Sequence, residues 1–457
     1  KSVEDSLKRL IYPSVEREIR NELTDKGEEG AINIFKANLK ALLMQSPIKG
    51  KTILGYDPGF RTGCKIVVLD DTGKLLDTAT VYATAPQNDV EGAIKTLKSL
   101  VYKHNVDVVS LGNGTASRES EEVLVRLIKE VKQERGNDLF YVIVSEAGAS
   151  VYSASSLGTK EYPDINVSLR GAISIGRRLQ DPLAELVKID PKAIGVGQYQ
   201  HDVTPKKLDE GLKGVVEDCV NTVGVDLNIA TASLLGYISG INDGIAKNIV
   251  AYREENGKFA KRKELLKVKR LGNKAFEQCA GFLRVPESKE ALDNTGVHPE
   301  SYIKAKELIE ILGYKKEELK SGNLPDIENK ILNLGYEPVA EKLDIGIPTL
   351  KDIVKELKKP GRDIREDLPK PILKTGLIEI KQLTEGMILT GTVRNVADFG
   401  AFVDIGVHQD GLVHISELSD SFVKHPLDIV SVGDIVEVRV LSVDEKRKRI
   451  ALSMKKQ

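Results

Sequence analysis

The sequence has few cysteines, no long apolar run and almost no net charge. Its three cysteines, Cys64, Cys219 and Cys279, are far apart and form no CxxC pair. This spacing argues against a disulfide framework and against a structural zinc site. No apolar run approaches the roughly 18 residues that a membrane-spanning helix needs. We therefore expect a cytoplasmic protein that does not cross a membrane.

Positive and negative charges are balanced in this chain, so its surface as a whole does not attract a polyanion. Lys plus Arg number 67 and Asp plus Glu number 68, which gives a formal net charge of −1. Bulk electrostatics would not draw such a chain to nucleic acid. Any nucleic-acid signal must therefore be local.

Changes in the hydrophobic pattern divide the chain, which at 457 residues is too long for one ordinary core. The first residues have the spaced apolar positions of a helix and lack an initiator Met, so we expect the end of a truncated N-terminal helical domain. The expected parts are this helical segment at 1–48, an α/β domain at 49–180, a helical region with two hairpins at 181–285, a helical connector at 286–374 and a small all-β barrel at 375–457.

The α/β domain has the predicted order βββαβαβ. Three short strands lie between residues 51 and 82, and they are followed by two helices that alternate with two buried strands. This order favours a mixed sheet with helices on its faces. Since the carboxyl ends of parallel strands meet at one edge, we expect Asp57, Gly112-Asn113-Gly114 and Glu146 to lie close together.

This order, with Asp57 at the end of the first strand, resembles the YqgF family of the RNase H-like fold, which is related to Holliday-junction resolvases. The resemblance implies Glu146 as a second acid. It places a third acid at the start of the next helix, where the sequence has Arg170 or Gly171 instead. Two-metal cleavage of a phosphodiester needs about three carboxylates, and an arginine beside two acids would repel Mg²⁺ and could pair with the acids.

We therefore predict a degenerate site with no metal or other cofactor and no enzyme activity. Asp164, Glu119 and Glu121 are acids nearby, but none has the third position. The alternative is a metal-dependent, structure-selective nuclease that uses Asp57 and Glu146, and only this alternative would require Mg²⁺ or Mn²⁺.

The C-terminal part contains five short β-rich runs, which predict a small closed barrel of the OB type. The run VADFGAFVDIGVHQDGLVHISELS resembles the ribosomal protein S-one type of RNA-binding domain. Phe399 and Phe402 are candidate stacking platforms for unpaired bases. The resemblance adds His414 as a third contact and implies a rim that contains Asp444, Arg447 and Lys448.

Charge counts indicate how the barrel binds. Residues 375–457 hold 10 Lys plus Arg against 12 Asp plus Glu, a net charge of −2. Binding should therefore depend on stacking and a few placed cations, and it should favour single strands.

The two hairpins at 231–285 each resemble one helix-hairpin-helix unit, whose turn exposes backbone N–H groups to a phosphate. The turns are Ser239-Gly240-Ile241 and Arg270-Leu271-Gly272. This region holds 11 Lys plus Arg against 5 Asp plus Glu, a net charge of +6. The predicted phosphate contacts are Gly240, Gly272, Lys261, Arg262, Lys263, Lys269, Arg270 and Lys274. The alternative is a pair of packed helical hairpins with a solvated basic face.

The order of these parts resembles the Tex family of bacterial transcription accessory proteins, without the family's N-terminal helix-turn-helix region. The segments VSLRGAISIGRRLQDPLAELVKIDPKAIGVGQYQHDV, LKVKRLGNKAFEQCAGFLR and PTLKDIVKELKKPGRD carry this resemblance. It implies a nucleic-acid-binding protein connected with transcription. The expected partners are RNA, single-stranded or structured DNA, and the transcription machinery.

Overall fold

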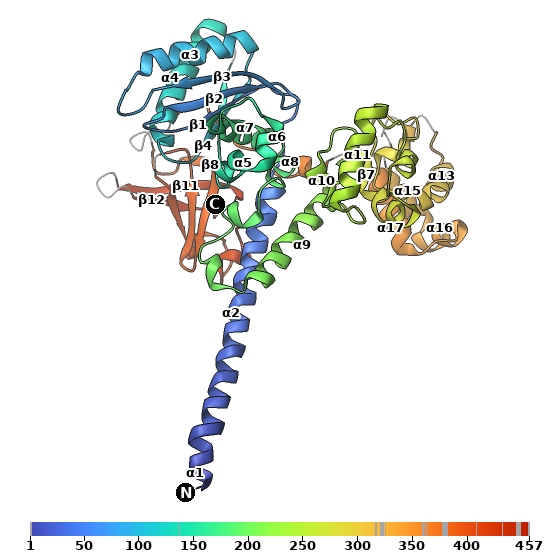
Figure 1. Cartoon of the computed structure of the whole chain (residues 1–457). Coiled ribbons are helices and arrows are strands. Elements are labelled where there is room, and N and C mark those ends of the chain that lie inside the picture. The colour runs from blue at the N-terminus through green and yellow to red at the C-terminus, as the bar shows by residue number, and fades with distance from the viewer. Residues whose placement is uncertain are drawn as a thin grey trace. The chain divides into compact units, whose positions relative to one another are not determined.

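The computed structural model describes residues 2–136, 138–315, 318–319, 324, 326–358, 361, 363–376, 383–407, 409–431, 433–444 and 449–455. The chain divides into two compact units (Figure 1). One unit consists of Lys1–Lys213 together with Pro369–Gln457, and the other consists of Gly214–Leu368. Among the described residues, no helix combines the length and the apolar character that crossing a membrane requires.

The first unit begins with a long helix. α1, Ser2–Ser6, and a π-helical turn at Leu7–Ile11 lead into α2, Tyr12–Leu43. The buried side chains of α2, which are Ile32, Phe35, Leu39 and Leu43, all lie in its last part. Apolar packing against the rest of the unit therefore begins near residue 32.

A five-stranded mixed sheet follows in the order β3-β2-β1-β4-β5. Its strands are β1, Ile53–Asp57; β2, Cys64–Leu69; β3, Leu75–Val81; β4, Val108–Gly112; and β5, Phe140–Val144. β1 is antiparallel to β2 and parallel to β4, and β5 is parallel to β4. The carboxyl ends of β1, β4 and β5 therefore lie at one edge, as the predicted order requires.

Helices cover both faces of this sheet. α3, Val90–His104, and α4, Ser117–Arg135, contribute to the apolar core on one face. α7, Val167–Gln180, packs on the other face, where Ala172 and Ile173 meet Val67 and Leu69. A Cβ atom on residue 55 would lie 2.5 Å from the carbonyl oxygen of Ala172, so only glycine lets α7 approach β1 this closely. The short helices α5, Ala149–Ala154; α6, Ser156–Glu161; and α8, Pro182–Leu186, flank α7 in the sequence.

A closed five-stranded barrel completes the first unit. Its strands are β8, Ile388–Ala397; β9, Gly400–Asp404; β10, Gly411–His414; β11, Ile435–Asp444; and β12, Arg449–Ser453. They close in the order β10-β12-β11-β8-β9 around an apolar core. Before the barrel, Lys374 exchanges two backbone hydrogen bonds of 2.9 Å with Tyr141 of β5.

In its described residues, the second unit is helical except for two short parallel strands, β6, Val225–Asp226, and β7, Leu283–Arg284. α9, Pro205–Val223, leads into the two predicted hairpins, which use α10, Ala232–Leu235; α11, Asp243–Asn256; a 3₁₀ helix, Arg262–Lys267; and α12, Asn273–Cys279. A separate apolar core joins α13, Tyr302–Ile311; α15, Ile327–Leu334; α16, Tyr336–Leu343; and α17, Ile347–Lys358. The predicted fold class, a mixed α/β sheet with a hairpin region and a C-terminal barrel, is thus confirmed.

Candidate functional site

The barrel places the two predicted phenylalanines side by side. Phe399 lies in the turn between β8 and β9 and is 51% exposed, whereas Phe402 lies in β9 and is partly buried. Their ring centroids are 6.0 Å apart and the ring planes meet at 88°. This edge-to-face contact fixes the two rings relative to each other and leaves aromatic surface on the outside of the barrel.

A glycine and a histidine complete this surface. Gly400 has φ +153°, and a Cβ atom there would collide with the carbonyl oxygen of Val413, so the close pairing of β9 with β10 requires glycine. His414 lies opposite Gly400 in β10 and is exposed. The backbone N–H of Ser416 donates to Nδ1 of His414 at 3.3 Å, which holds the imidazole ring at the start of the 3₁₀ helix Ile415–Glu417.

The predicted basic rim is described only in part. Asp444 is exposed at the end of β11 and pairs in register with Arg449. Arg447 and Lys448 lie outside the described residues. Their predicted contacts with nucleic acid therefore stay predictions.

The two hairpin turns share one backbone geometry. Gly240 has φ +80° and Arg270 has φ +69°, so an arginine occupies in the second turn the left-handed position that glycine occupies in the first. Ile241 and Leu271 follow these residues and are buried. Asn242 and Gly272 come next and precede α11 and α12, respectively. Each hairpin thus keeps only one of the two glycines of the Gly-hydrophobic-Gly pattern that is common in helix-hairpin-helix turns.

The cations of the hairpins differ in accessibility. Lys261, Lys263, Lys269, Arg270 and Lys274 are exposed. Arg262 is 0% exposed, and its guanidinium group donates to the backbone oxygens of Leu283, Asp293, Thr295 and Val297 and to the hydroxyl of Tyr302. The prediction that Arg262 contacts phosphate is therefore wrong, because its donors are used inside the fold.

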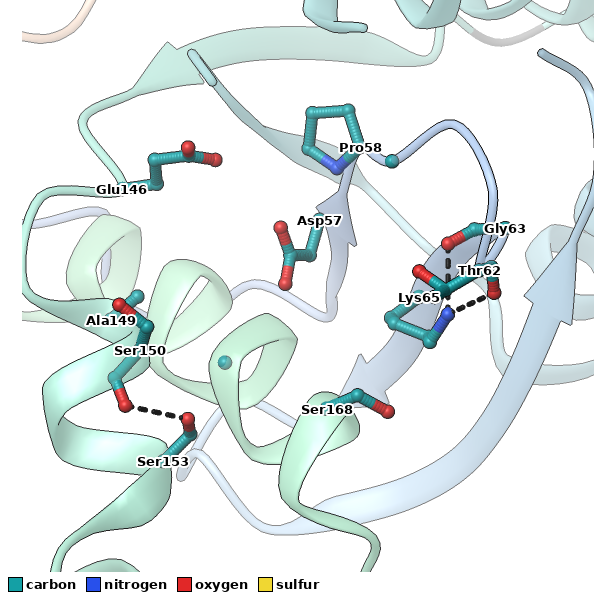
Figure 2. Close-up of a pocket in the computed structure, with 12 residues that line it drawn as sticks. Asp57, Pro58, Thr62, Gly63, Lys65, Glu146, Ala149, Ser150, Ser153 and Ser168 are labelled. Carbon is teal, nitrogen blue, oxygen red and sulfur yellow. Dashed lines mark hydrogen bonds between the residues drawn. The ribbon is translucent and has the colours of Figure 1, made fainter. Parts of the chain in front are cut away.

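Asp57 and Glu146 line one pocket at the carboxyl edge of the sheet (Figure 2). Asp57 ends β1, and Glu146 follows β5. The other residues that line the pocket are Pro58, Gly59, Thr62, Gly63, Lys65, Ala149, Ser150, Ser153, Ser168 and Gly171. The predicted proximity of the two acids is confirmed.

Lys65 is a pocket residue that the sequence reasoning missed. It lies opposite Asp57 in the β1–β2 register and is 9% exposed. Its ammonium group donates to the carbonyl oxygens of Thr62 and Gly63, the latter at 2.8 Å (Figure 2). Its position near the start of β2, just after the turn that follows Asp57, was the available signal, because antiparallel pairing brings such residues together.

The two carboxyl groups are hard to ionise. Burial and the nearby Glu146 carboxylate raise the pKa of Asp57 from 3.8 to about 7, although the Lys65 ammonium acts in the opposite direction. Burial also raises the pKa of Glu146, against the effects of the Gly114 N–H group and the Arg178 cation. A cation bound here would lower both pKa values.

Gly171 is the residue of α7 that faces Asp57. A Cβ atom on residue 171 would lie 3.1 Å from Oδ2 of Asp57. Arg170 points elsewhere: its Nε donates to the carbonyl oxygen of Tyr162 at 3.1 Å, and its Nη1 donates to Oγ1 of Thr159 at 2.9 Å. Of the two residues expected at the third position, Gly171 and not Arg170 therefore faces Asp57, because consecutive helical residues point about 100° apart.

The other acids considered for the third position do not line the pocket. Glu121 is buried and accepts a hydrogen bond of 2.7 Å from the Tyr141 hydroxyl, whereas Glu119 and Asp164 are exposed. Within the described residues, no three or more His, Cys, Asp or Glu side chains are grouped so that they could hold a metal ion. Among the described residues that line this pocket, Asp57 and Glu146 are the only acids.

These features define a class of multidomain proteins that combine an RNase H-like sheet, helix-hairpin-helix units and an RNA-binding barrel. Family models match the Tex protein YqgF-like domain at 51–180, the helix-hairpin-helix motif at 220–284 and the S1 RNA binding domain at 382–455. A further helix-hairpin-helix domain matches 290–365, where the sequence reasoning expected only a helical connector.

Relatives match the chain almost from end to end. "Uncharacterized protein YdcI" of Bacillus subtilis is 55% identical over 100% of this chain and 62% of its own length. "Protein tex" of Bordetella pertussis is 52% identical over 97% of this chain and 55% of its own length. "S1 RNA-binding domain-containing protein 1" of Homo sapiens is 39% identical over 99% of this chain and 51% of its own length.

The chain belongs to the Tex family. It spans between 51% and 62% of the length of these three relatives.

Proposed function

We propose that this chain binds RNA and other single-stranded nucleic acid through its barrel and its exposed hairpin cations. We propose further that the RNase H-like domain is a scaffold without nuclease activity. The observation that carries the proposal is the edge-to-face pair of Phe399 and Phe402 on the surface of a barrel that matches the S1 RNA binding domain. The barrel region has a net charge of −2, so stacking must supply much of its affinity.

A link to transcription is part of the proposal. Relatives carry the names "Transcriptional accessory protein Tex" in Neisseria gonorrhoeae and "Protein tex" in Bordetella pertussis. A transcription complex presents nascent single-stranded RNA, which is the ligand that suits exposed aromatic rings. Binding of the chain to a stalled elongation complex, with and without nuclease digestion of the emerging RNA, tests this link.

The double substitution Phe399→Ala and Phe402→Ala tests the barrel. Stacking contributes about 1–3 kcal/mol per base, so the affinity for single-stranded RNA should fall about 5-fold or more, with little change in its salt dependence. Fluorescence anisotropy with a labelled unstructured RNA gives both quantities. Ile388→Ala is the matched control, since Ile388 is a 62% exposed aliphatic residue of β8. Unchanged affinity in the double variant would contradict the proposal.

The hairpin cations should contribute mainly through phosphate contacts. Changing Lys261, Lys263 and Lys269 together to Gln should flatten the plot of log affinity against log salt, by about 0.7 for each lost contact with a single strand. The same change at Lys40, Lys95 and Lys129, which are exposed lysines of the other unit, is the control. Equal slopes in the two triple variants would argue that the basic face of the hairpins is only solvated.

The alternative function is a metal-dependent, structure-selective nuclease that uses Asp57 and Glu146. The observation that favours it is that both carboxyl groups line one pocket. Incubation of labelled RNA, DNA and a four-way junction with Mg²⁺ or Mn²⁺ separates the two functions. Cleavage by the parent that is lost in Asp57→Asn would replace the scaffold role by the nuclease role.

A further inference from the structure

Phe422 is an aromatic side chain that lies outside the apolar core of the barrel. It is 95% exposed, more than Phe399 at 51%. It lies in the segment that crosses from β10 to β11, between the 3₁₀ helices Ile415–Glu417 and Pro426–Asp428. Nearly all of its ring is in water, so it contributes almost nothing to the apolar core of the barrel.

The segment around Phe422 is anchored on both sides. Leu418 and Val423 are buried in the barrel core, with 2% and 8% exposure. Before the ring, the backbone N–H of Ser421 donates to Oγ of Ser419 at 3.2 Å; after it, the N–H of Val430 donates to the oxygen of Pro426 at 3.0 Å. With Val423 fixed in the core, the neighbouring Phe422 side chain is directed outward.

Phe422 follows the end of the barrel that carries Phe399 and His414. His414 is paired with Gly400, and the backbone N–H of Ile415 donates to the carbonyl oxygen of Phe399 at 2.8 Å. The crossing segment therefore starts against the turn that carries Phe399. The chain then reaches Phe422 eight residues after His414.

We propose that Phe422 is a further stacking site for single-stranded RNA, which extends the binding surface of Phe399 and Phe402. This inference rests on the proposed RNA-binding function of the barrel. A base needs one open ring face and tolerates polar surroundings. The residues next to the ring are polar: Ser419, Asp420 and Ser421 precede it, and Lys424 and His425 follow after Val423. In a barrel region with a net charge of −2, each added ring matters more because phosphate attraction is weak.

The test compares three substitutions at residue 422 in the full chain. Phe422→Ala should weaken binding of a long oligouridylate by about 5-fold or more. Phe422→Leu keeps an apolar side chain but has no aromatic face, so it should weaken binding nearly as much, whereas Phe422→Tyr should keep the parent affinity. Leu427→Ala is the control, because Leu427 is a 57% exposed aliphatic residue of the same segment. Oligouridylates of about 4 to 16 nucleotides cover the range of site sizes for such barrels. The affinity lost in Phe422→Ala should vanish with the shortest of these oligomers.

Each outcome has a separate meaning. If the parent binds no single-stranded RNA, the proposed function and this inference both fail. If Phe399→Ala with Phe402→Ala weakens binding but Phe422→Ala does not, only this inference is overturned. Full affinity in Phe422→Leu also overturns it, since an apolar contact would then suffice and stacking would not be the cause. Unchanged thermal unfolding of each variant ensures that the affinities compare folded proteins.

Discussion

Asp57 illustrates at the scale of one residue how burial controls the chemistry of a pocket. Its carboxyl group ends a buried strand, meets a second carboxylate and has one ammonium group across the register. Together these surroundings hold its pKa near 7. At neutral pH the pocket therefore contains a carboxyl group that is only partly ionised.

This raised pKa predicts a pH dependence of stability. The folded chain keeps the Asp57 proton up to a pH of about 7, whereas the unfolded chain loses it near 3.8. The folded state thus binds more protons in this range, and its free energy of unfolding should fall as the pH rises, by up to about 1.4 kcal/mol per pH unit.

Denaturant unfolding of the parent and of Asp57→Asn at several pH values measures this pH dependence. The variant should have a flatter profile, and the exposed Asp164→Asn should keep the parent profile. Parallel profiles of the parent and Asp57→Asn would show that the pKa is not raised.

A single side chain at residue 171 should change the metal affinity of the pocket. Gly171→Asp adds a carboxylate beside Asp57, because the new Cβ atom would lie 3.1 Å from its Oδ2. Three carboxylates with oxygen ligands suit Mg²⁺ and Mn²⁺ better than two. We expect Mn²⁺ affinity at least about 10-fold above that of the parent, measured by electron paramagnetic resonance, which corresponds to about 1.4 kcal/mol.

Two controls separate ligation from other effects of this substitution. Gly171→Ser adds a side chain without a carboxylate and should bind Mn²⁺ as weakly as the parent. The addition of Asp57→Asn to Gly171→Asp should remove the gain. A gain that survives this second change would place the metal elsewhere.

At the scale of elements, the two hairpins reach the same geometry with different residues. The first turn has glycine at the left-handed position and asparagine before the helix, whereas the second has arginine and glycine in these places. Oδ1 of Asn242 accepts a hydrogen bond of 3.0 Å from the N–H of Ile245 and so caps α11. The backbone shape, and not the glycine pattern, is what the two units share.

This difference predicts effects of unequal size for substitutions at the two equivalent positions. Gly240→Ala should destabilise the chain by about 1 kcal/mol or more, since its backbone has φ +80° and a Cβ atom would lie 2.6 Å from that of Gln278. Arg270→Gly relieves the left-handed backbone strain at φ +69°, which stabilises the folded chain, but it also raises the entropy of the unfolded chain, which destabilises the fold. Because these two effects oppose each other, the free energy of unfolding should change by less than about 1 kcal/mol. Chemical denaturation measures both. A larger loss for Arg270→Gly than for Gly240→Ala would contradict this account.

At the scale of the whole molecule, positive charge and exposed aromatic rings lie in different parts of the chain. The hairpin region at 231–285 has a net charge of +6, the barrel region at 375–457 has −2 and the chain has −1. Phosphate attraction should therefore come mainly from the hairpins, and selectivity for single strands should come from the barrel.

Removal of the barrel tests this division. A chain that ends at residue 374 keeps the backbone pairing of Lys374 with Tyr141 and should retain salt-dependent binding through the hairpins. Its preference for single-stranded over double-stranded RNA should largely disappear in a competition assay. Unchanged affinity and preference would show that the barrel is not the main binding module.

The sequence by itself determined the elements and the kinds of domain. Strand and helix follow from local periodicity, so the βββαβαβ order of elements, the five strands of the barrel and the proximity of Asp57 and Glu146 could be predicted. The pattern did not reveal the helix-hairpin-helix match at 290–365, where it indicated only a helical connector.

Only the tertiary structure decided what individual side chains face. Lysines beside Arg262 are exposed while Arg262 is buried, because its partners come from residues 283 to 302, which the local sequence cannot indicate. Gly171 and not Arg170 meets Asp57, since the rotation of α7 is set by its packing on β1. Lys65 enters the pocket through strand pairing, and Phe422 remains in water because Val423 takes the place in the core. Periodicity specifies where the chain turns, but the environment of a side chain depends on segments that folding brings to it from elsewhere.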